Sequence, residues 1–135
     1  RIGNTEDAAK KMAEILEKKG CPKVAISDLA REDMAEALED AFRYGKIVLA
    51  APSYNALVMP FMEDFLHHLQ GKNYQKRTVA LVENGSWAPS AAKSMRAMLE
   101  QMKEITVIEP AVTIRGAFKE SDIAALEAAA DALLA

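Results

Sequence analysis

Segments with the periodicity of a buried strand alternate with helical segments along almost the whole chain. The apolar runs KVAISD (23–28), KIVLAAP (46–52) and RTVALVEN (77–84) are typical of short strands, and the second has the continuous hydrophobicity of a strand buried on both faces. A fourth strand is expected within ITVIEPAVTIRG (105–116). Because strands that alternate with helices form parallel sheets with helical crossovers, this order predicts an α/β fold.

Five segments carry apolar residues three and four positions apart, as the buried face of a helix requires. The second helix is expected to stop near Gly45, and the third to begin at Pro60 and end at Gly71. The positions expected to face the core are Ala9, Met12, Ala13 and Leu16, then Met34, Leu38, Ala41 and Phe42, then Phe61, Met62, Phe65, Leu66 and Leu69, then Met95, Met98, Leu99 and Met102, and finally Ile123, Leu126, Ala130 and Leu133.

Composition limits the class of protein. With 135 residues, of which 50% are hydrophobic, the chain is expected to form one domain over residues 1–135. Its net charge of -3, without a block of like charge, gives no support for a nucleic-acid surface. The lone Cys21 forms no internal disulfide and suits a reducing, cytoplasmic environment. No apolar run approaches the roughly 18 residues of a membrane span, so no membrane partner is expected.

Ligands of open parallel sheets bind where strands end and helices begin, which selects three loops: RIGNTE (1–6), APSYNALVMP (51–60) and VENGSWAPS (82–90). The first combines a glycine, two side-chain donors and a helix N-terminus, which suits a phosphate. It lacks the Gly-Lys-Ser/Thr of a P-loop and the three spaced glycines of a dinucleotide site, so a single phosphate is favoured. Taken alone, the segment fits a simple helix cap by Asn4 or Thr5 better.

The other two loops each place one aromatic residue among small and polar ones. Tyr54 and Trp87 are suited to face a planar ring, although each taken alone is more often a packing residue. Backbone and amide groups near Asn55 and Asn84 would then reach the polar edge of that ring. The two loops together indicate a flavin.

These segments resemble, over the whole chain, the flavodoxin-like domain that forms the carboxyl-terminal part of flavodiiron proteins, also called A-type flavoproteins. That family has a phosphate loop of the form S-M-Y-G-N-T-E, a segment P-T-Y/I-N-N after the third strand and a segment G-S/A-Y-G-W after the fourth. Here the matching residues are Gly3, Asn4, Thr5 and Glu6 in the first, Pro52, Tyr54 and Asn55 in the second, and Trp87 in the third. The sequence departs from the family at Arg1 and Ile2, at Ser53, at Ala56 and at Glu83 to Ser86, where the glycine-tyrosine turn before the matching Trp87 is replaced.

The resemblance implies a flavodoxin-like three-layer α/β/α sandwich with strand order 2-1-3-4-5 and non-covalently held FMN. FMN is expected to take electrons from a donor such as rubredoxin or a flavin reductase and to pass them to a diiron domain of the metallo-beta-lactamase type, which reduces oxygen or nitric oxide. The implied cofactor-binding residues are Arg1, Ile2, Gly3, Asn4, Thr5, Pro52, Ser53, Tyr54, Asn55, Ala56, Glu83, Asn84, Gly85, Ser86 and Trp87.

Two other functions stay open. The flavodiiron domain is the favoured interpretation, and the alternatives are a free-standing flavodoxin-like electron carrier and an interaction module without a cofactor. Association with further copies of itself is compatible with each. No catalytic residue is expected. No metal site is expected either, because the adjacent His67 and His68 point about 100° apart on a helix and cannot bind one metal ion together. A response-regulator receiver is disfavoured, since LAAPS (49–53) stands where that class needs an aspartate. The charge of Glu83 is expected to disfavour a reduced, anionic flavin.

The first helix has no strand before it, although the first segment has the character of a loop that follows one. In the order 2-1-3-4-5, that strand would lie between KVAISD and KIVLAAP. We therefore expect a gap of roughly 10 Å between these two segments in this chain. We also expect the chain that begins at Arg1 to be unstable and free of flavin until a strand precedes it.

Overall fold

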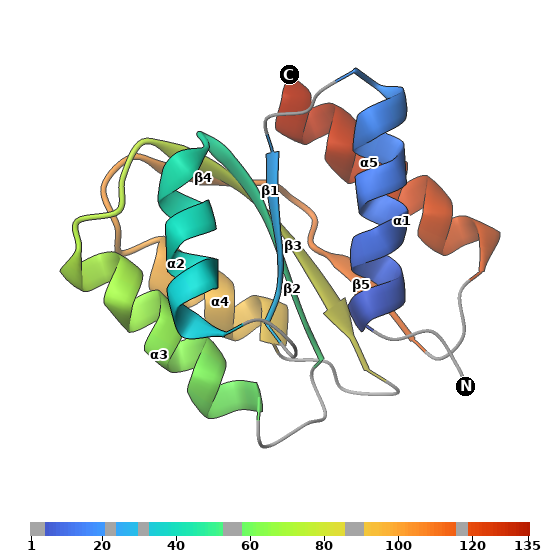
Figure 1. Cartoon of the computed structure of the whole chain (residues 1–135). Coiled ribbons are helices and arrows are strands. Elements are labelled where there is room, and N and C mark those ends of the chain that lie inside the picture. The colour runs from blue at the N-terminus through green and yellow to red at the C-terminus, as the bar shows by residue number, and fades with distance from the viewer. Residues whose placement is uncertain (1–4, 21–23, 30–32, 53–57, 86–90, 116–118) are drawn as a thin grey trace.

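The computed structural model describes residues 5–20, 24–29, 33–52, 58–85, 91–115 and 119–135. These residues form a parallel sheet between two layers of helices (Figure 1). The elements are α1 (Thr5–Lys18), β1 (Val24–Asp28), α2 (Met34–Arg43), β2 (Lys46–Pro52), α3 (Val58–Gly71), β3 (Arg77–Asn84), α4 (Ala91–Leu99), β4 (Ile105–Val107), β5 (Val112–Ile114) and α5 (Glu120–Leu134). None of the described helices is both long and apolar enough to cross a membrane.

The sheet runs in the order β1-β2-β3-β4, and β5 also pairs with β3. The prediction of a single strand within 105–116 is therefore wrong in detail, because this segment forms two three-residue strands, which pair with successive parts of β3. Val107 lies opposite Val79, and Val112 lies opposite Val82. Pro110 lies between the two strands and has no N–H to donate to a ladder, which accounts for the interruption.

Strands β1 and β2 are direct parallel neighbours. Val24 lies opposite Lys46, and Asp28 lies opposite Ala50. The prediction of a gap between these two segments is therefore wrong. The expected instability was based on unpaired backbone groups at that gap, and these groups are paired in the ladder between β1 and β2. The spatial order of the strands is the one that remains when the first strand is removed from the order 2-1-3-4-5. The strands on either side of that position are paired directly.

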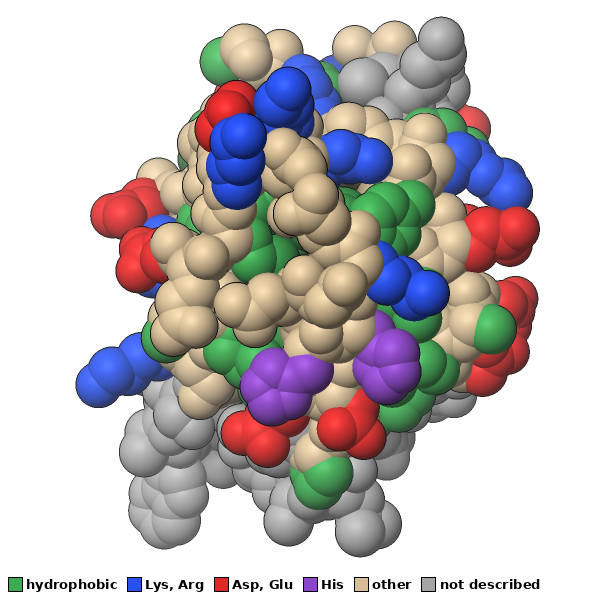
Figure 2. All heavy atoms as spheres, turned by 90° about the vertical axis from the view of Figure 1, so that its left-hand side faces the viewer, with side chains coloured by type: hydrophobic (Ala, Val, Ile, Leu, Met, Phe, Trp, Pro, Cys, Tyr) green, Lys and Arg blue, Asp and Glu red, His purple; other side chains and the backbone are tan. Residues whose placement is uncertain are grey.

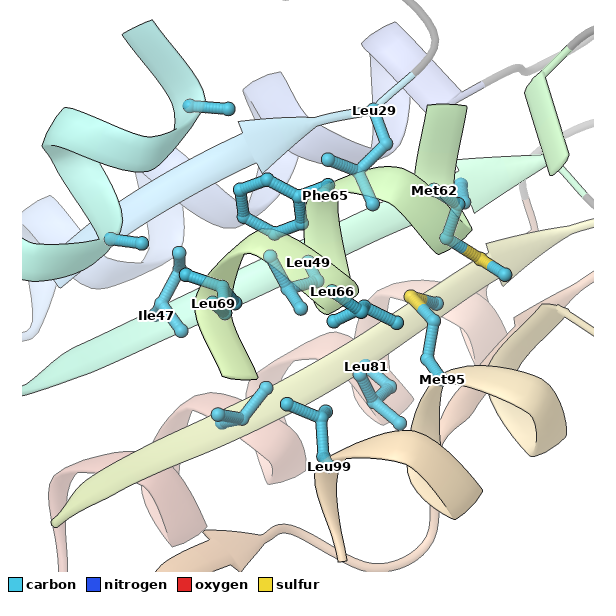
Figure 3. Packing of buried hydrophobic residues seen from close by; sticks show 14 of the residues in the cluster. Leu29, Ile47, Leu49, Met62, Phe65, Leu66, Leu69, Leu81, Met95 and Leu99 are labelled. Carbon is cyan, nitrogen blue, oxygen red and sulfur yellow. The ribbon is translucent and has the colours of Figure 1, made fainter. Parts of the chain in front are cut away.

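Alternate residues of the central strands face the two helical layers. Ile47 and Leu49 belong to the cluster that α2, α3 and α4 cover, whereas Val48 and Ala50 pack with α1 and α5. Figure 3 shows the first cluster, in which side chains of α3 and α4 lie over β2 and β3. This alternation follows from the two-residue period of a strand and confirms that β2 is buried on both faces.

Three helices differ from expectation in phase or length. Ala8 and Ile15 of α1 are buried, while Ala13 is exposed, because the bulkier Ile15 determines which face packs on the sheet. Helix α3 begins at Val58, so Pro60 lies in its first turn, where backbone N–H groups have no partner within the helix. Helix α4 ends at Leu99, although Met102 remains buried beyond it.

Candidate functional site

The predicted ligand edge exists as one end of the molecule. The carboxyl ends of β1, β2, β3 and β5 lie at the same end as the N-terminus of α1 (Figure 1). Parallel pairing brings this about, because it fixes Pro52 opposite Asn84 and Asn84 opposite Ile114. Three of the described residues from the predicted loops, Thr5, Pro52 and Asn84, are buried at this end.

The first loop is described only from Thr5 onward. Thr5 is the first residue of α1 and is 4% exposed, with Glu6 and Asp7 following it in the first turn. The first backbone N–H groups of a helix have no partner within it and carry the positive end of the dipole. Arg1, Ile2, Gly3 and Asn4 lie outside the described residues, so their predicted role is untested.

The second loop contributes one described residue, Pro52, which ends β2 and is buried. Its neighbour across the ladder, Asn84, ends β3 and is 4% exposed. Ser53, Tyr54, Asn55 and Ala56 lie outside the described residues. The structure thus shows where this loop leaves the sheet, and the ring-facing role of Tyr54 remains a prediction.

The third loop is described at its start. Glu83, Asn84 and Gly85 are all buried, and the Gly85 N–H donates a hydrogen bond of 3.0 Å to the Ile114 carbonyl. This bond continues the contact between β3 and β5 one residue beyond β3. Ser86 and Trp87 lie outside the described residues, so a contact between Trp87 and a flavin ring remains a prediction.

Glu83 has partners that the sequence does not reveal. Its Oε1 accepts a hydrogen bond of 3.0 Å from the backbone N–H of Ala92, and its Oε2 accepts one of 2.8 Å from the Thr113 hydroxyl. The residue is 6% exposed. These partners lie nine and thirty positions from Glu83 in the sequence, and the periodicity of a single helix or strand does not predict contacts over such separations. Glu83 is therefore a buried carboxylate at the start of α4, not a surface acid.

A second carboxylate caps a helix at this end of the molecule. Asp33 precedes α2, and its side chain accepts a hydrogen bond of 2.9 Å from the Glu36 N–H. This bond lowers the pKa of Asp33, whereas the hydrogen bond with Asp33 raises the pKa of the Glu36 carboxyl. Unlike Glu83, Asp33 is exposed.

The described residues contain no group of three or more His, Cys, Asp and Glu side chains placed to hold a metal ion. His67 and His68 are exposed on α3, and Figure 2 shows the two histidines at the surface beside acidic side chains. The Nδ1 atom of His68 lies 2.8 Å from the Asp64 carbonyl, to which it donates in the tautomer that carries a proton on Nδ1.

A five-stranded parallel sheet with α1 and α5 on one face and α2, α3 and α4 on the other is a flavodoxin-like fold. Neither a family model nor a curated protein matches the sequence. The similar solved structures include flavodoxins and two longer chains, of which this chain covers about a third.

Rubredoxin oxygen:oxidoreductase from Desulfovibrio gigas superimposes with a TM-score of 0.79 at 16% identity, covering 96% of this chain and 32% of that one. A flavodoxin from the domain Archaea gives 0.76 at 17% identity and covers 98% and 90% of the two chains. The flavodiiron core of a Synechocystis protein gives 0.70 at 14% identity and covers 98% and 33%. This chain therefore spans about a third of two of these proteins and most of the third, and identities this low establish the fold alone.

Proposed function

We propose that this chain binds FMN at the carboxyl edge of its sheet and carries electrons. The observation that carries the proposal is the meeting of the α1 N-terminus with the ends of β2 and β3 at one edge of a flavodoxin-like sheet. Ligands of open α/β sheets bind at this edge. Flavodoxins are among the structures that share the fold, which favours a flavin over other ligands.

The described residues fit the phosphate end of such a cofactor. The N-terminus of α1 offers backbone N–H groups to an anion, and Thr5 adds a buried hydroxyl at the first helical position. Glu6 is paired with Lys10 at 3.5 Å, which partly offsets the acidic charge of this first turn. Gly3 and Asn4 would complete the cradle, as the sequence predicts.

The proposed site for the flavin ring is formed by the loops that follow Pro52 and Gly85. Ser53, Tyr54, Asn55, Ala56, Ser86 and Trp87 would surround the isoalloxazine there, with Asn84 and Gly85 at its polar edge. Bound FMN would supply one- and two-electron transfer, while the protein would hold, orient and electrostatically tune it.

The finer proposal concerns the partners. Two of the similar structures belong to longer chains, a rubredoxin oxygen:oxidoreductase and a flavodiiron core. We favour a role as the flavin domain of such a protein, which would relay electrons from rubredoxin or a flavin reductase to a diiron domain. The alternative is a free-standing carrier, which is supported by the archaeal flavodoxin, since the chain covers 90% of it. The length of the native polypeptide in its source cells distinguishes these two functions: a polypeptide about three times as long would favour the flavin domain, and one of about this length would favour the carrier.

Titration with FMN and with riboflavin, which lacks the phosphate, tests the proposal. We expect one equivalent of FMN to bind and riboflavin to bind more weakly. Thr5→Val should weaken FMN binding by roughly 10-fold or more, because a hydrogen bond to a charged group contributes about 1.5–3 kcal/mol, and should leave riboflavin binding unchanged. The control is Thr106→Val, at an exposed threonine of β4. Absence of FMN binding, or equal effects of the two variants, would contradict the proposal.

A further inference from the structure

The Glu83 carboxylate joins three elements at the candidate flavin edge. Glu83 belongs to β3, its Oε1 accepts from Ala92 in the first turn of α4, and its Oε2 accepts from Thr113 of β5. Glu83 and Thr113 are also register partners in the parallel ladder, so their side chains project from the same face of the sheet. We call Glu83, Ala92 and Thr113 the Glu83 clasp.

The clasp connects the two described ends of the third loop. The chain leaves β3 at Asn84 and enters α4 at Ala91, and the hydrogen bond from Ala92 to Glu83 spans that interval. On the departing side, the Gly85 N–H is bonded to the Ile114 carbonyl. The point where the loop leaves the sheet and the point where it enters the helix are therefore held relative to each other and to β5.

The surroundings explain why a carboxylate is tolerated here. A buried charge is costly unless hydrogen bonds and nearby dipoles compensate it. Here a helix N-terminal N–H and a hydroxyl donate to the two oxygens, and the positive end of the α4 dipole favours the negative charge. Ala91 and Ala92 are small and buried, which lets the start of α4 approach β3 closely.

We propose that Glu83 is a positioning residue of the candidate flavin site, which fixes the start of α4 against β3 and β5 and thereby the ends of the loop predicted to hold the ring. This inference rests on the proposed FMN binding. In this proposal the carboxylate acts through its hydrogen bonds with Ala92 and Thr113, so an uncharged side chain that keeps these two bonds should replace it. Glutamine fits, since its oxygen can accept from Ala92 and its amide can donate to the Thr113 oxygen.

Three variants test the contribution of the hydrogen bonds in the Glu83 clasp. Glu83→Ala removes both hydrogen bonds, Thr113→Val removes one with little change in shape, and Glu83→Gln retains both. The control, Asp33→Ala, removes a carboxylate-to-helix hydrogen bond of the same kind from α2. Four quantities are measured for each protein: thermal midpoint, amide exchange at Ala92, the FMN dissociation constant and the visible circular dichroism of the bound flavin.

We expect Glu83→Ala to speed exchange at Ala92, to raise the FMN dissociation constant by about 10-fold and to change the flavin dichroism. Thr113→Val should raise that constant by about threefold, and Glu83→Gln should stay within about twofold of the wild type. Asp33→Ala should lower the thermal midpoint and leave flavin affinity and dichroism unchanged.

Unchanged affinity and dichroism in both Glu83→Ala and Thr113→Val would overturn the positioning role, and so would an equal loss of affinity in Asp33→Ala. If Glu83→Ala does not fold, Thr113→Val alone decides. Wild-type protein that binds no FMN would contradict the proposed function and this role with it. The exchange rate at Ala92 would still show whether the hydrogen bond to Glu83 exists, so the two failures are distinguishable.

Discussion

The Arg77 guanidinium lies over the Tyr74 ring, with its central carbon 5.1 Å from the ring centroid. The same group lies 5.9 Å from the Phe42 centroid, and the two rings meet edge to face at 5.2 Å. Arg77 also donates hydrogen bonds to the carbonyls of Phe42, Tyr44 and Gln75. One side chain therefore joins the end of α2 to the start of β3, at the end of the sheet away from the candidate site.

Replacing Arg77 with lysine should destabilise the fold by about 1–3 kcal/mol, because a lysine lacks the planar fork that serves three carbonyls and two rings. Chemical denaturation measures the change. Arg43→Lys is the matched control, since Arg43 is exposed and its contact to Glu39 is 3.8 Å long. Equal stability of the two variants would show that the Arg77 contacts contribute little.

Burial raises the pKa of Tyr74 to about 12, and the charge of Arg77 opposes part of this rise. The unfolded chain loses this proton near the ordinary value of 10.0, before the folded chain does. The stabilisation is therefore complete below pH 10 and is lost as the pH rises through about 12. Unfolding free energies measured between pH 8 and about 12 should fall steeply at the upper end.

Tyr74→Phe should reduce that alkaline loss of stability. Among the described residues the Tyr74 hydroxyl is buried without a hydrogen-bond partner, so its removal should leave stability at pH 7 unchanged or raise it by about 1 kcal/mol. Denaturation of the two proteins at pH 7 and above pH 10 provides the comparison. A loss of several kcal/mol at pH 7 would indicate that the hydroxyl has a partner.

Direct pairing of β1 with β2 predicts slow hydrogen exchange on both edges of β2. The β2 amides that face β1 should exchange on the order of a thousandfold more slowly than in an unfolded peptide, as should those that face β3. Exchange followed by NMR distinguishes the two sets. Rapid exchange of only those amides that face β1 would contradict the pairing of β1 with β2 and would support the expected gap.

The ring site is tested at the two aromatic residues. If Tyr54 and Trp87 face the isoalloxazine, binding should quench FMN fluorescence strongly, and Trp87→Leu should restore part of it. Fluorescence titration of the wild type and of single leucine variants gives the measurement. Unchanged quenching and affinity in both variants would exclude these residues from the site.

Local sequence was sufficient where one element's own pattern dominates. Strands β2 and β3 have the predicted bounds, because a continuous apolar run buried on both faces is marked by its own residues. The same patterns predicted five helices and a parallel sheet. They also placed Thr5, Pro52 and Asn84 at strand and helix ends, which parallel pairing gathers at one edge.

Only the tertiary structure decided relations between distant segments. The pairing of β1 with β2, the division of the last strand into β4 and β5, and the partners of Glu83 all depend on which backbone groups and side chains meet across the sheet. The exact phase of α1 depended on it too, since the sheet buries Ala8 and Ile15 beside Met12 and Leu16 and leaves Ala13 exposed. Periodicity reports the faces of a single element, whereas hydrogen bonding and packing between elements are set by the whole fold.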